Sequence, residues 1–284
     1  MSAIKITECP RDAMQGIIHF IPTELKAAYI NLLLQVGFDT IDFGSFVSPK
    51  AIPQMQDTAE VLKKLDLSTT KSKLLAIIAN YRGAEDAARY EEISYLGYPF
   101  SISETFQLRN ANTGIQQAFD TVKRVKELCA IKNKELLVYL SMGFGNPYGD
   151  EWSVDIVSQW TERLVDEGIN IIALSDTVGV ATPDQVSEIY PVLAQTYPDT
   201  EFGLHLHATP ANWHNKIAAA YQSGCKRFDA ALRGYGGCPM AADELTGNIA
   251  TENLISYLQL QNEHLGLNLD KFQEAMEYSG NVFL

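Results

Sequence analysis

The sequence lacks the cysteine pattern of a disulfide-stabilised protein or a zinc ribbon. Only four cysteines occur in 284 residues, none in a CxxC pair, and a chain of this length needs no disulfide to be stable. It also lacks an apolar run of about 18 residues and an N-terminal leader, so we expect neither membrane anchoring nor export. These absences predict reduced thiols and a cytoplasmic location.

Positive charge is scarce as well. The chain carries 22 lysines and arginines against 35 aspartates and glutamates, which gives a formal net charge of −13. Such a surface repels nucleic-acid phosphates and anionic lipid head groups, so we expect no nucleic-acid and no membrane partner. An anionic substrate would need a local cationic patch or a bound metal ion.

The common phosphate-binding motifs are also missing. No GxxxxGK[ST] segment occurs, and the glycines of residues 142–149 follow the spacing GxGxxxG instead of GxGxxG. The sequence therefore predicts neither a P-loop nor a Rossmann dinucleotide site.

What the chain does have is a regular alternation of short apolar, β-rich segments with longer segments of helical periodicity. This alternation predicts βα units around a parallel sheet. The eight expected strands are 4–8, 40–46, 74–80, 98–103, 136–142, 171–176, 202–207 and 227–232. Because no linker rich in Pro, Gly or Ser interrupts them, we predict an α/β fold in which residues 1–284 form one domain. Residues 4–266 would form a (β/α)₈ TIM barrel.

The clearest helical segments are 23–36, 115–131 and 152–167. A short extra C-terminal helix is expected at 269–278, outside the eightfold pattern. The strand at 98–103 is expected to be short or bulged, because Pro99 cannot donate a hydrogen bond to a β-ladder.

Polar residues gather where each predicted strand gives way to its following loop. In (β/α)₈ barrels the active site is built at this C-terminal end of the strands. The set consists of Arg11, Asp12, Asp42, Ser45, Asn80, Ser103, Glu104, Ser141, Asp176, Thr177, His205, His207 and Arg233.

His205 and His207 lie two residues apart on a predicted strand, so both rings point to the same face. Two imidazoles at a barrel mouth form half of a metal site, although the pair is equally consistent with two structural histidines. Asp12 and Asn248 could add oxygen ligands. A mixed nitrogen and oxygen set suits Mg²⁺ or Mn²⁺, with Zn²⁺ less favoured.

Three further side chains are candidates for the chemistry. Arg11 could stabilise an enolate oxygen beside the metal, or simply form an exposed charge pair with Asp12. Asp42 could pair with Arg11, act as a base or cap a turn, since a buried carboxylate needs a partner. Cys238 lies in a glycine-rich loop able to close over a substrate, and a thiol near a cation can exchange protons, although a lone loop cysteine is more often incidental.

In combination and order, these motifs carry a family resemblance. The chain resembles 3-hydroxy-3-methylglutaryl-CoA lyases, within a wider group of metal-dependent lyases and condensing enzymes on this barrel. The resemblance spans about residues 4–257 and rests on the segments 8–15, 45–55, 174–179, 205–207, 236–239 and 247–252.

The resemblance implies a divalent-metal-dependent lyase that cleaves 3-hydroxy-3-methylglutaryl-CoA, an acyl-CoA ester, into acetoacetate and acetyl-CoA. The implied metal ligands are Asp12, His205, His207 and Asn248. Arg11 would stabilise the acetyl-CoA enolate, and Cys238 would donate or accept a proton. Asp176 and Glu252 would be supporting carboxylates near the site. A homodimer is also expected from the family.

Several positions depart from the family pattern. Asp42 stands where the family usually has Glu, and Ala208 stands where Asp commonly follows the histidines, which removes an acceptor able to orient a ligand ring. The fifth loop lacks an expected cysteine near residues 144–148, and the Cys238 loop is one residue longer. An alternative is therefore a lyase or condensing enzyme of the same group that acts on a different hydroxyacyl-CoA or 2-oxo acid. A non-catalytic barrel that binds CoA or metal is a less favoured alternative, because the arginine, ligands and loop cysteine are all retained.

Two assignments stay open. The general base is Asp42, Cys238 or a metal-bound water. The contacts to the CoA nucleotide are unassigned, with Lys50 and Arg109 as candidates by charge alone.

Overall fold

Eight parallel strands form a closed barrel in the computed structural model, which describes residues 3–237 and 246–283. Each strand pairs with the next in chain order, and the eighth pairs with the first to close the ring. The strands are β1 (Lys5–Glu8), β2 (Thr40–Ser45), β3 (Lys73–Ile77), β4 (Ile93–Ser101), β5 (Glu135–Ser141), β6 (Ile171–Ser175), β7 (Glu201–His205) and β8 (Arg227–Ala230). The predicted barrel is thereby confirmed.

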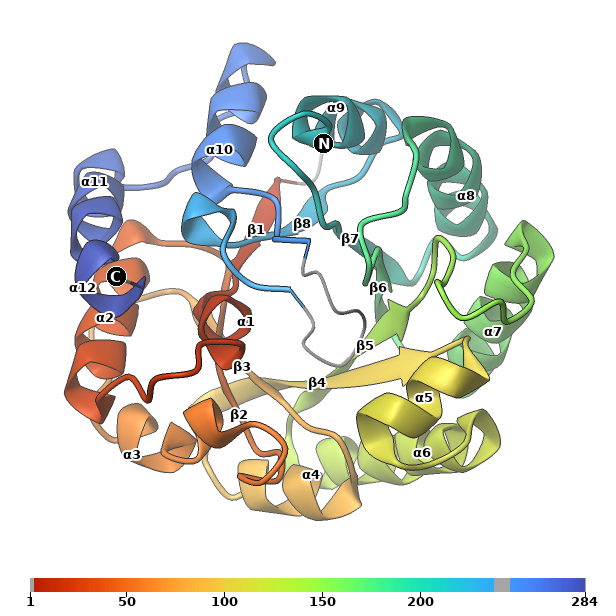
Figure 1. Ribbon diagram of the computed structural model, residues 1–284, viewed down its shortest axis with the longest axis horizontal. Helices are drawn as coiled ribbons and strands as arrows, with labels where there is room; N and C mark the ends of the chain where they lie inside the picture. The colour runs from red at the N-terminus through yellow and green to blue at the C-terminus, as the bar shows by residue number, and fades with distance from the viewer. Residues whose placement is uncertain (1–2, 238–245, 284) are drawn as a thin grey trace.

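Helices connect the strands and surround the barrel (Figure 1). They are α1 (Pro10–Gln15), α2 (Thr23–Val36), η1 (Pro53–Met55), α3 (Thr58–Leu62), α4 (Tyr81–Ala87), α5 (Glu104–Ala111), α6 (Ile115–Lys132), α7 (Val154–Asp166), α8 (Pro183–Thr196), α9 (Trp213–Gln222), η2 (Leu232–Gly234), α10 (Thr251–Leu260), α11 (Leu269–Tyr278) and α12 (Gly280–Phe283). Ser153 begins α7 by accepting a hydrogen bond from the Ile156 N–H, which explains why this helix is shorter than expected. In the described part of the chain, no helix is long and apolar enough to cross a membrane.

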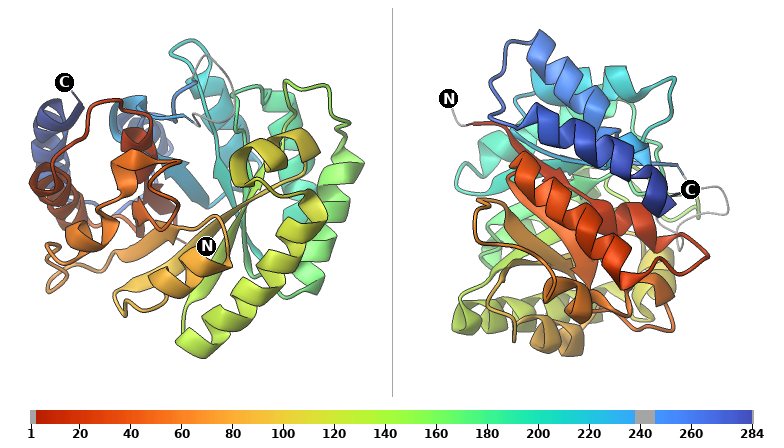
Figure 2. Two further views of the ribbon diagram at one scale, coloured as in Figure 1. Left: turned by 60° about the horizontal axis from the view of Figure 1, so that its bottom comes forward. Right: turned by 90° about the vertical axis from the view of Figure 1, so that its left-hand side faces the viewer.

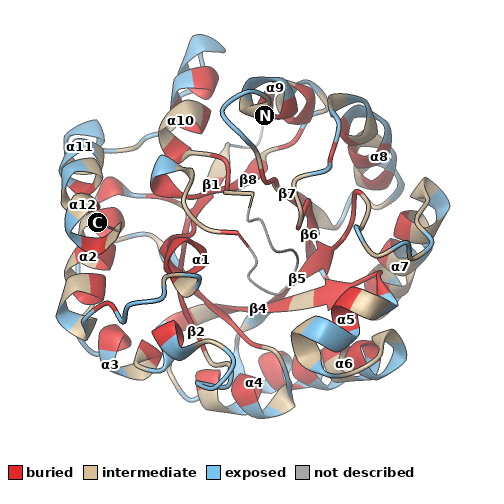
Figure 3. Cartoon of the chain, viewed as in Figure 1, coloured by how far each residue is buried: buried red, intermediate tan, exposed pale blue. Residues whose placement is uncertain are grey.

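The core has two apolar layers, which appear in Figure 3 as buried strands and buried inner faces of the helices. Inside the barrel, Leu75, Leu137 and Ile171 pack together with alternate residues of β3 to β6. The intervening residues of the same strands, such as Leu74 and Val138, belong to the larger layer between the sheet and the helices. Because side chains fill the interior, a functional site is expected at an open end of the barrel.

The predicted C-terminal helix is present as α11, which lies beside α2 (Figure 2, right). The Asn268 N–H donates to the Val36 carbonyl at 2.9 Å, and Phe272 packs edge to face on Phe38. The C-terminal segment is therefore attached to the first large helix of the barrel.

The bounds predicted for the fourth strand were wrong. β4 runs from Ile93 to Ser101, so it is longer than the expected strand at 98–103, and the irregularity expected at Pro99 lies elsewhere in the strand. Its residues 95–101 pair in unbroken register with Glu135–Ser141 of β5, because Pro99 removes one donor and leaves every neighbouring backbone group in place. The register shift of this strand lies earlier, opposite Leu74 and Leu75 of β3.

Candidate active site

Three of the predicted metal ligands converge at the C-terminal end of the barrel. Asp12 lies on α1, which directly follows β1, while His205 ends β7 and His207 lies two residues beyond it. One ligand atom from each of the three side chains lies within 4.8 Å of the others. The short helix α1 was not predicted from the sequence, and it carries Asp12 to the histidines across the adjacent β8.

Asn248 reaches the same cluster through backbone pairing. An isolated antiparallel bridge joins His207 to Asn248, and the Ala208 N–H donates to the Gly247 carbonyl at 2.9 Å. The Asn248 Nδ2 donates to Asp12 Oδ2 at 2.6 Å and to the Tyr235 carbonyl at 2.9 Å. The segment before α10 thus places an amide beside the carboxylate and the histidines, although it lies more than 230 residues from Asp12 in the chain.

Several polar atoms of this cluster have incomplete hydrogen bonding. The Nε2 atoms of His205 and His207 face each other at 3.1 Å. The buried Oδ1 of Asn248 has no hydrogen-bond partner among the described residues. Unpaired buried acceptors are costly and usually have a functional reason. Two imidazole nitrogens, a carboxylate and an unpaired amide oxygen form a donor set that fits a divalent cation.

The electrostatics favour the protonation states that metal ligands require. Burial would raise the pKa of Asp12, but Arg11 and the two histidines outweigh it and lower that pKa to about 2. Burial, reinforced by His205, lowers the pKa of His207 to about 3. At neutral pH the carboxylate is ionised and His207 is neutral, as metal binding demands.

Arg11 is held rigidly next to this cluster. Its NH2 donates to Asp42 Oδ2 at 2.6 Å and its Nε to the same oxygen at 3.0 Å, while its NH1 donates to Asp12 Oδ1 at 2.9 Å. NH1 also donates to Gln15 Oε1 at 2.9 Å. Only 8 % of Arg11 is exposed, so it is not the exposed charge pair that the sequence left open. A buried guanidinium held by three side chains presents a fixed positive charge to the cavity.

Asp42 lies behind Arg11 and is fully buried. A register shift between Asp42 and Gly44 marks an irregularity of β2 against β3. Gly44 is needed there, because a Cβ would lie 2.5 Å from the Thr58 methyl group. Burial raises the pKa of Asp42 to about 6 although Arg11 opposes the shift, so the carboxylate is ionised at neutral pH. The sequence left three roles open for Asp42, and the geometry shows the pairing with Arg11.

Asp176 does not lie among the ligand atoms. Its Oδ2 accepts a hydrogen bond at 2.6 Å from Lys216 Nζ, and Lys216 also donates to the His207 carbonyl at 2.7 Å. Burial raises the pKa of Asp176, and Lys216 opposes that shift. Lys216 was missed in the sequence, where it is one lysine in an amphipathic helix. The pair attaches α9 to the backbone of His207.

Glu252 is also one layer away from the cluster. Its Oε2 accepts from the Arg233 N–H at 3.0 Å. Glu8, which was not predicted as a site residue, accepts from the Leu232 N–H at 2.8 Å and from the Thr251 hydroxyl at 2.5 Å. Burial raises the pKa of Glu8 to about 8. The two glutamates thus bond to Leu232 and Arg233 before the segment that carries Asn248, and to Thr251 after it.

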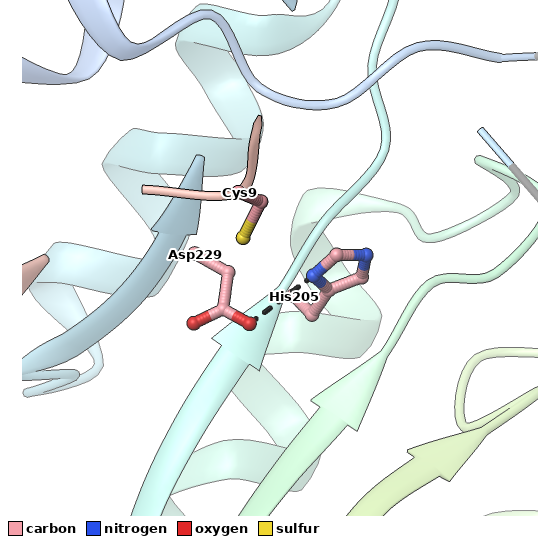
Figure 4. Close-up of side chains that lie close together, drawn as sticks. All are labelled: Cys9, His205 and Asp229. Carbon is pink, nitrogen blue, oxygen red and sulfur yellow. Dashed lines mark hydrogen bonds and ion pairs between the residues drawn. The ribbon is translucent and has the colours of Figure 1, made fainter. Parts of the chain in front are cut away.

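Asp229 is a further residue that sequence reasoning missed, after Lys216 and Glu8. It lies on β8 opposite His205 on β7, and its Oδ2 lies 3.2 Å from His205 Nδ1. Burial lowers the pKa of His205, but Asp229 outweighs it and the net shift is upward. The alternation of residues along β8 could have indicated that Asp229 points inward. Figure 4 shows its carboxylate beside the ring of His205, with the Cys9 thiol next to both.

A cavity of about 390 Å³ opens over the cluster. Arg11, Asp12, His205 and His207 contribute to its wall, together with Ser141 and other polar residues from neighbouring strands. Arg109 also lines it, with its guanidinium 4.7 Å from the centre of the Tyr148 ring. Lys50 does not line this cavity. The sequence offered Lys50 and Arg109 equally as CoA contacts, and the structure distinguishes them by position.

The predicted loop residue Cys238 lies outside the described residues. The chain immediately before it passes close to the cluster at Gly236, which has φ +108°. A Cβ at Gly236 would lie 2.5 Å from Asn248 Nδ2 and 2.9 Å from Asp12 Oδ2. Glycine is therefore required where this segment crosses the candidate metal ligands.

Sequence comparisons agree with the geometry. The HMGL-like family profile matches residues 3–278. The mitochondrial hydroxymethylglutaryl-CoA lyase of Mus musculus is 32 % identical over 97 % of this chain and 84 % of its own length. A hydroxymethylglutaryl-CoA lyase of Bacillus subtilis is 32 % identical over 95 % of this chain and 89 % of its own length.

Solved structures give the same result. An HMG-CoA lyase of Acinetobacter baumannii, in complex with coenzyme A and 3-methylmalate, superposes with a TM-score of 0.92 at 31 % identity. The alignment covers 99 % of this chain and 91 % of that one. The HMG-CoA lyase of Bacillus subtilis superposes with a TM-score of 0.91 at 31 % identity, covering 98 % of this chain and 93 % of that one.

Proposed function

The chain belongs to the HMGL-like family, and we propose that it cleaves 3-hydroxy-3-methylglutaryl-CoA into acetoacetate and acetyl-CoA with Mg²⁺ or Mn²⁺ as cofactor. Membership of this family makes it a carbon–carbon lyase. The substrate is inferred from the relatives, two of which were described above as lyases for this thioester.

The observation that carries the proposal is the convergence of four ligand side chains beside a fixed cation, with the Asn248 Oδ1 left unpaired among the described residues. Asp12, His205, His207 and Asn248 would hold the metal, with the two Nε2 atoms 3.1 Å apart and the Asn248 Oδ1 unpaired among the described residues. When bound, a divalent cation supplies Lewis acidity that lowers the pKa of a coordinated alcohol. The tertiary hydroxyl of the substrate is the group on which this acidity is needed.

Arg11 would stabilise the negative charge that develops as the carbon–carbon bond breaks. Cleavage leaves the electron pair on the acetyl-CoA fragment as an enolate, whose oxygen needs a fixed positive partner. The guanidinium lines the cavity, and its hydrogen bonds to Asp12 and Asp42 hold it in place before the reaction begins. Preorganised charge of this kind costs no reorganisation in the transition state.

Among the candidates for the general base, the geometry favours a positioning role for Asp42. Its carboxylate is fully buried, bonded to Arg11 and not part of the cavity wall. The hydroxyl proton would then pass to Cys238 or to a metal-bound water. Asp176 and Glu252 would act as supporting carboxylates, the first through Lys216 and the second through the Arg233 backbone.

The decisive experiment is a cleavage assay on purified protein treated with EDTA. Acetoacetate is measured with 3-hydroxy-3-methylglutaryl-CoA alone and after addition of Mg²⁺ or Mn²⁺. We expect product only with metal, and no metal-dependent product from His207→Ala. Cys225→Ser serves as a matched control, because this thiol is buried at the opposite end of β8 and bonds to the Arg227 carbonyl.

Absence of product from folded, metal-loaded protein would overturn the substrate assignment. The same assay with other hydroxyacyl-CoA esters and 2-oxo acids would then test the alternative activity within this group. Asp42 and Ala208 are the first positions to examine in that case. Reverting Asp42→Glu and Ala208→Asp would test whether they set the substrate preference.

A further inference from the structure

The ring of His205 stands between two different groups of ligand atoms. Its Nε2 faces His207 and the metal cluster proposed above, at 3.1 Å from His207 Nε2. Its Nδ1 faces away, toward Asp229 Oδ2 at 3.2 Å. On this second side the Cys9 thiol completes a set of three, in which one ligand atom of each residue lies within 4.8 Å of the others.

We propose that Cys9, His205 Nδ1 and Asp229 form a second cation site, which takes a thiophilic divalent ion such as Zn²⁺. The three side chains come from the ends of β1, β7 and β8, which are neighbours in the closed barrel. Figure 4 shows the three side chains close together, with a dashed line between the Asp229 carboxylate and the His205 ring.

The ligand chemistry distinguishes this site from its neighbour. Sulfur, nitrogen and oxygen in one set select a borderline or soft ion such as Zn²⁺, whereas the oxygen and nitrogen set on the other side of the ring suits Mg²⁺ or Mn²⁺. Three protein ligands also match zinc sites that keep a fourth position open. His205 would therefore be a shared ligand of two sites that select different metal ions.

The surroundings favour a cation at this point. Cys9 is fully buried and Asp229 is 4 % exposed, so a charge placed between them is poorly screened. Asp229, Asp42 and Asp12 add negative potential around the thiol. An entering ion would displace the thiol proton to solvent, forming a metal–sulfur bond as the S–H bond breaks, and a ring proton on His205 Nδ1 would move to Nε2 or to solvent so that the Nδ1 lone pair can bind the ion. His205 lines the cavity, so the site adjoins solvent through one of its ligands.

The inference does not depend on the proposed lyase activity, because it rests on the geometry of the three residues. The two are nevertheless linked through His205. An ion bound at Nδ1 would replace the contact with Asp229 that orients the ring for the other cluster. Occupancy of this site would therefore alter metal binding at the neighbouring one.

Cobalt absorption provides a direct test, since Co²⁺ bound to a thiolate gives an intense near-ultraviolet charge-transfer band that oxygen and nitrogen ligands do not give. Reduced, EDTA-treated full-length protein is titrated with Co²⁺ without oxygen. We expect the band to saturate within two equivalents in the wild type, because Co²⁺ can also enter the neighbouring site, and to be absent in Cys9→Ser. It should persist in Cys225→Ser, a matched buried thiol, and in Cys238→Ser. Circular dichroism checks that each variant is folded.

A measurement on the wild type alone keeps the test independent of the variants. Added Zn²⁺ should abolish the cobalt band at equimolar concentration, whereas a large excess of Mg²⁺ should not remove it. The proposal is overturned if folded wild-type protein gives no band or if Mg²⁺ removes it. A band that survives in Cys9→Ser but disappears in Cys238→Ser would also overturn it, by assigning the thiolate to the loop. None of these outcomes depends on lyase activity.

Discussion

The two ends of the barrel use charge in opposite ways. At the N-terminal end of the strands, Arg227 NH1 donates to Glu201 at 2.9 Å, and Lys5 donates to the same carboxylate at 2.5 Å. At the C-terminal end, two imidazole nitrogens face each other, and the Nδ1 of His207 and the Oδ1 of Asn248 lack partners among the described residues. The first end forms ion pairs within the protein. The second also forms ion pairs, such as Arg11 with Asp42, but it keeps possible metal-ligand atoms without partners.

The contrast is one of degree. Arg227 leaves its Nε without a partner among the described residues, although NH1 bonds to Glu201 and NH2 lies 3.5 Å from Thr40 Oγ1. Burying unsatisfied polar atoms lowers stability, and proteins retain such atoms mainly where a ligand will bind. We therefore expect substitutions at the C-terminal end to affect activity and those at the N-terminal end to affect stability.

The largest effect is expected from His207→Ala. Loss of one ligand should lower kcat at least about a thousandfold, which corresponds to about 4 kcal/mol of transition-state stabilisation. The free energy of unfolding should fall by no more than about 1 kcal/mol, because the ring has an unpaired Nδ1 in the folded protein. Steady-state kinetics and urea unfolding measure the two quantities. A large loss of stability with retained turnover would reverse the comparison.

The next effect is expected from Arg227→Met at the opposite end. Removing one partner of a buried ion pair commonly costs about 3–5 kcal/mol, and we expect about 3 kcal/mol because Glu201 keeps its contact with Lys5. Turnover and metal affinity should match the wild type, since the residue lies at the start of β8 and not at its end. Urea unfolding and the acetoacetate assay test this. Unchanged stability would refute the structural role assigned to the ion pairs.

Glu8 sharpens the comparison, because it is near the C-terminal end yet fully bonded. Burial raises the pKa of Glu8 from its ordinary value of 4.5 to about 8, so between these values the folded state holds a proton that the unfolded state has lost. By linkage, the free energy of unfolding falls as pH rises through this window. Glu8→Gln mimics the protonated carboxyl and cannot titrate, so its stability should lack this contribution to the pH dependence. The free energy of unfolding of the variant, relative to that of the wild type, should therefore rise by about 2 kcal/mol from pH 5 to pH 7.

Urea unfolding of both proteins at pH 5, 6 and 7 measures this difference. If the two stability profiles run parallel, Glu8 does not change its protonation between the unfolded and folded states in this range. Near-ultraviolet circular dichroism at each pH serves as the control for a native fold in both proteins.

The regular part of the fold was predictable because its signals are local. Alternating apolar segments predicted all eight strands, and the two-residue spacing predicted that His205 and His207 share a face. The clustering of Asp12 with both histidines follows from the topology, since β1 and β7 flank β8 in a closed barrel. Their roles as metal ligands stay predictions.

What the sequence did not reveal depends on partners distant in the chain. Lys216 looks like any helical lysine until the fold brings it to Asp176, 40 residues away. Asp229 and Cys9 gain meaning only through the ring of His205. The fourth strand was misjudged because the missing donor of Pro99 was weighed without the long, continuous pairing of β4 to β5.

The smallest effect is expected at the rim of the C-terminal end, where exposed cations surround the buried cluster of candidate metal ligands. Arg109 is an exposed cation that lines the cavity, whereas Lys50 is exposed and does not line it, although its neighbour Ala51 does. Suppose that Arg109 contacts a CoA phosphate equally in the bound substrate and in the transition state. Arg109→Ala should then raise KM several-fold, which corresponds to a loss of about 1 kcal/mol of binding free energy, and leave kcat unchanged. Lys50→Ala is the matched control and should change neither constant. An equal rise of KM in both variants would mean that general attraction of the anionic substrate, and not a specific contact, acts at the rim.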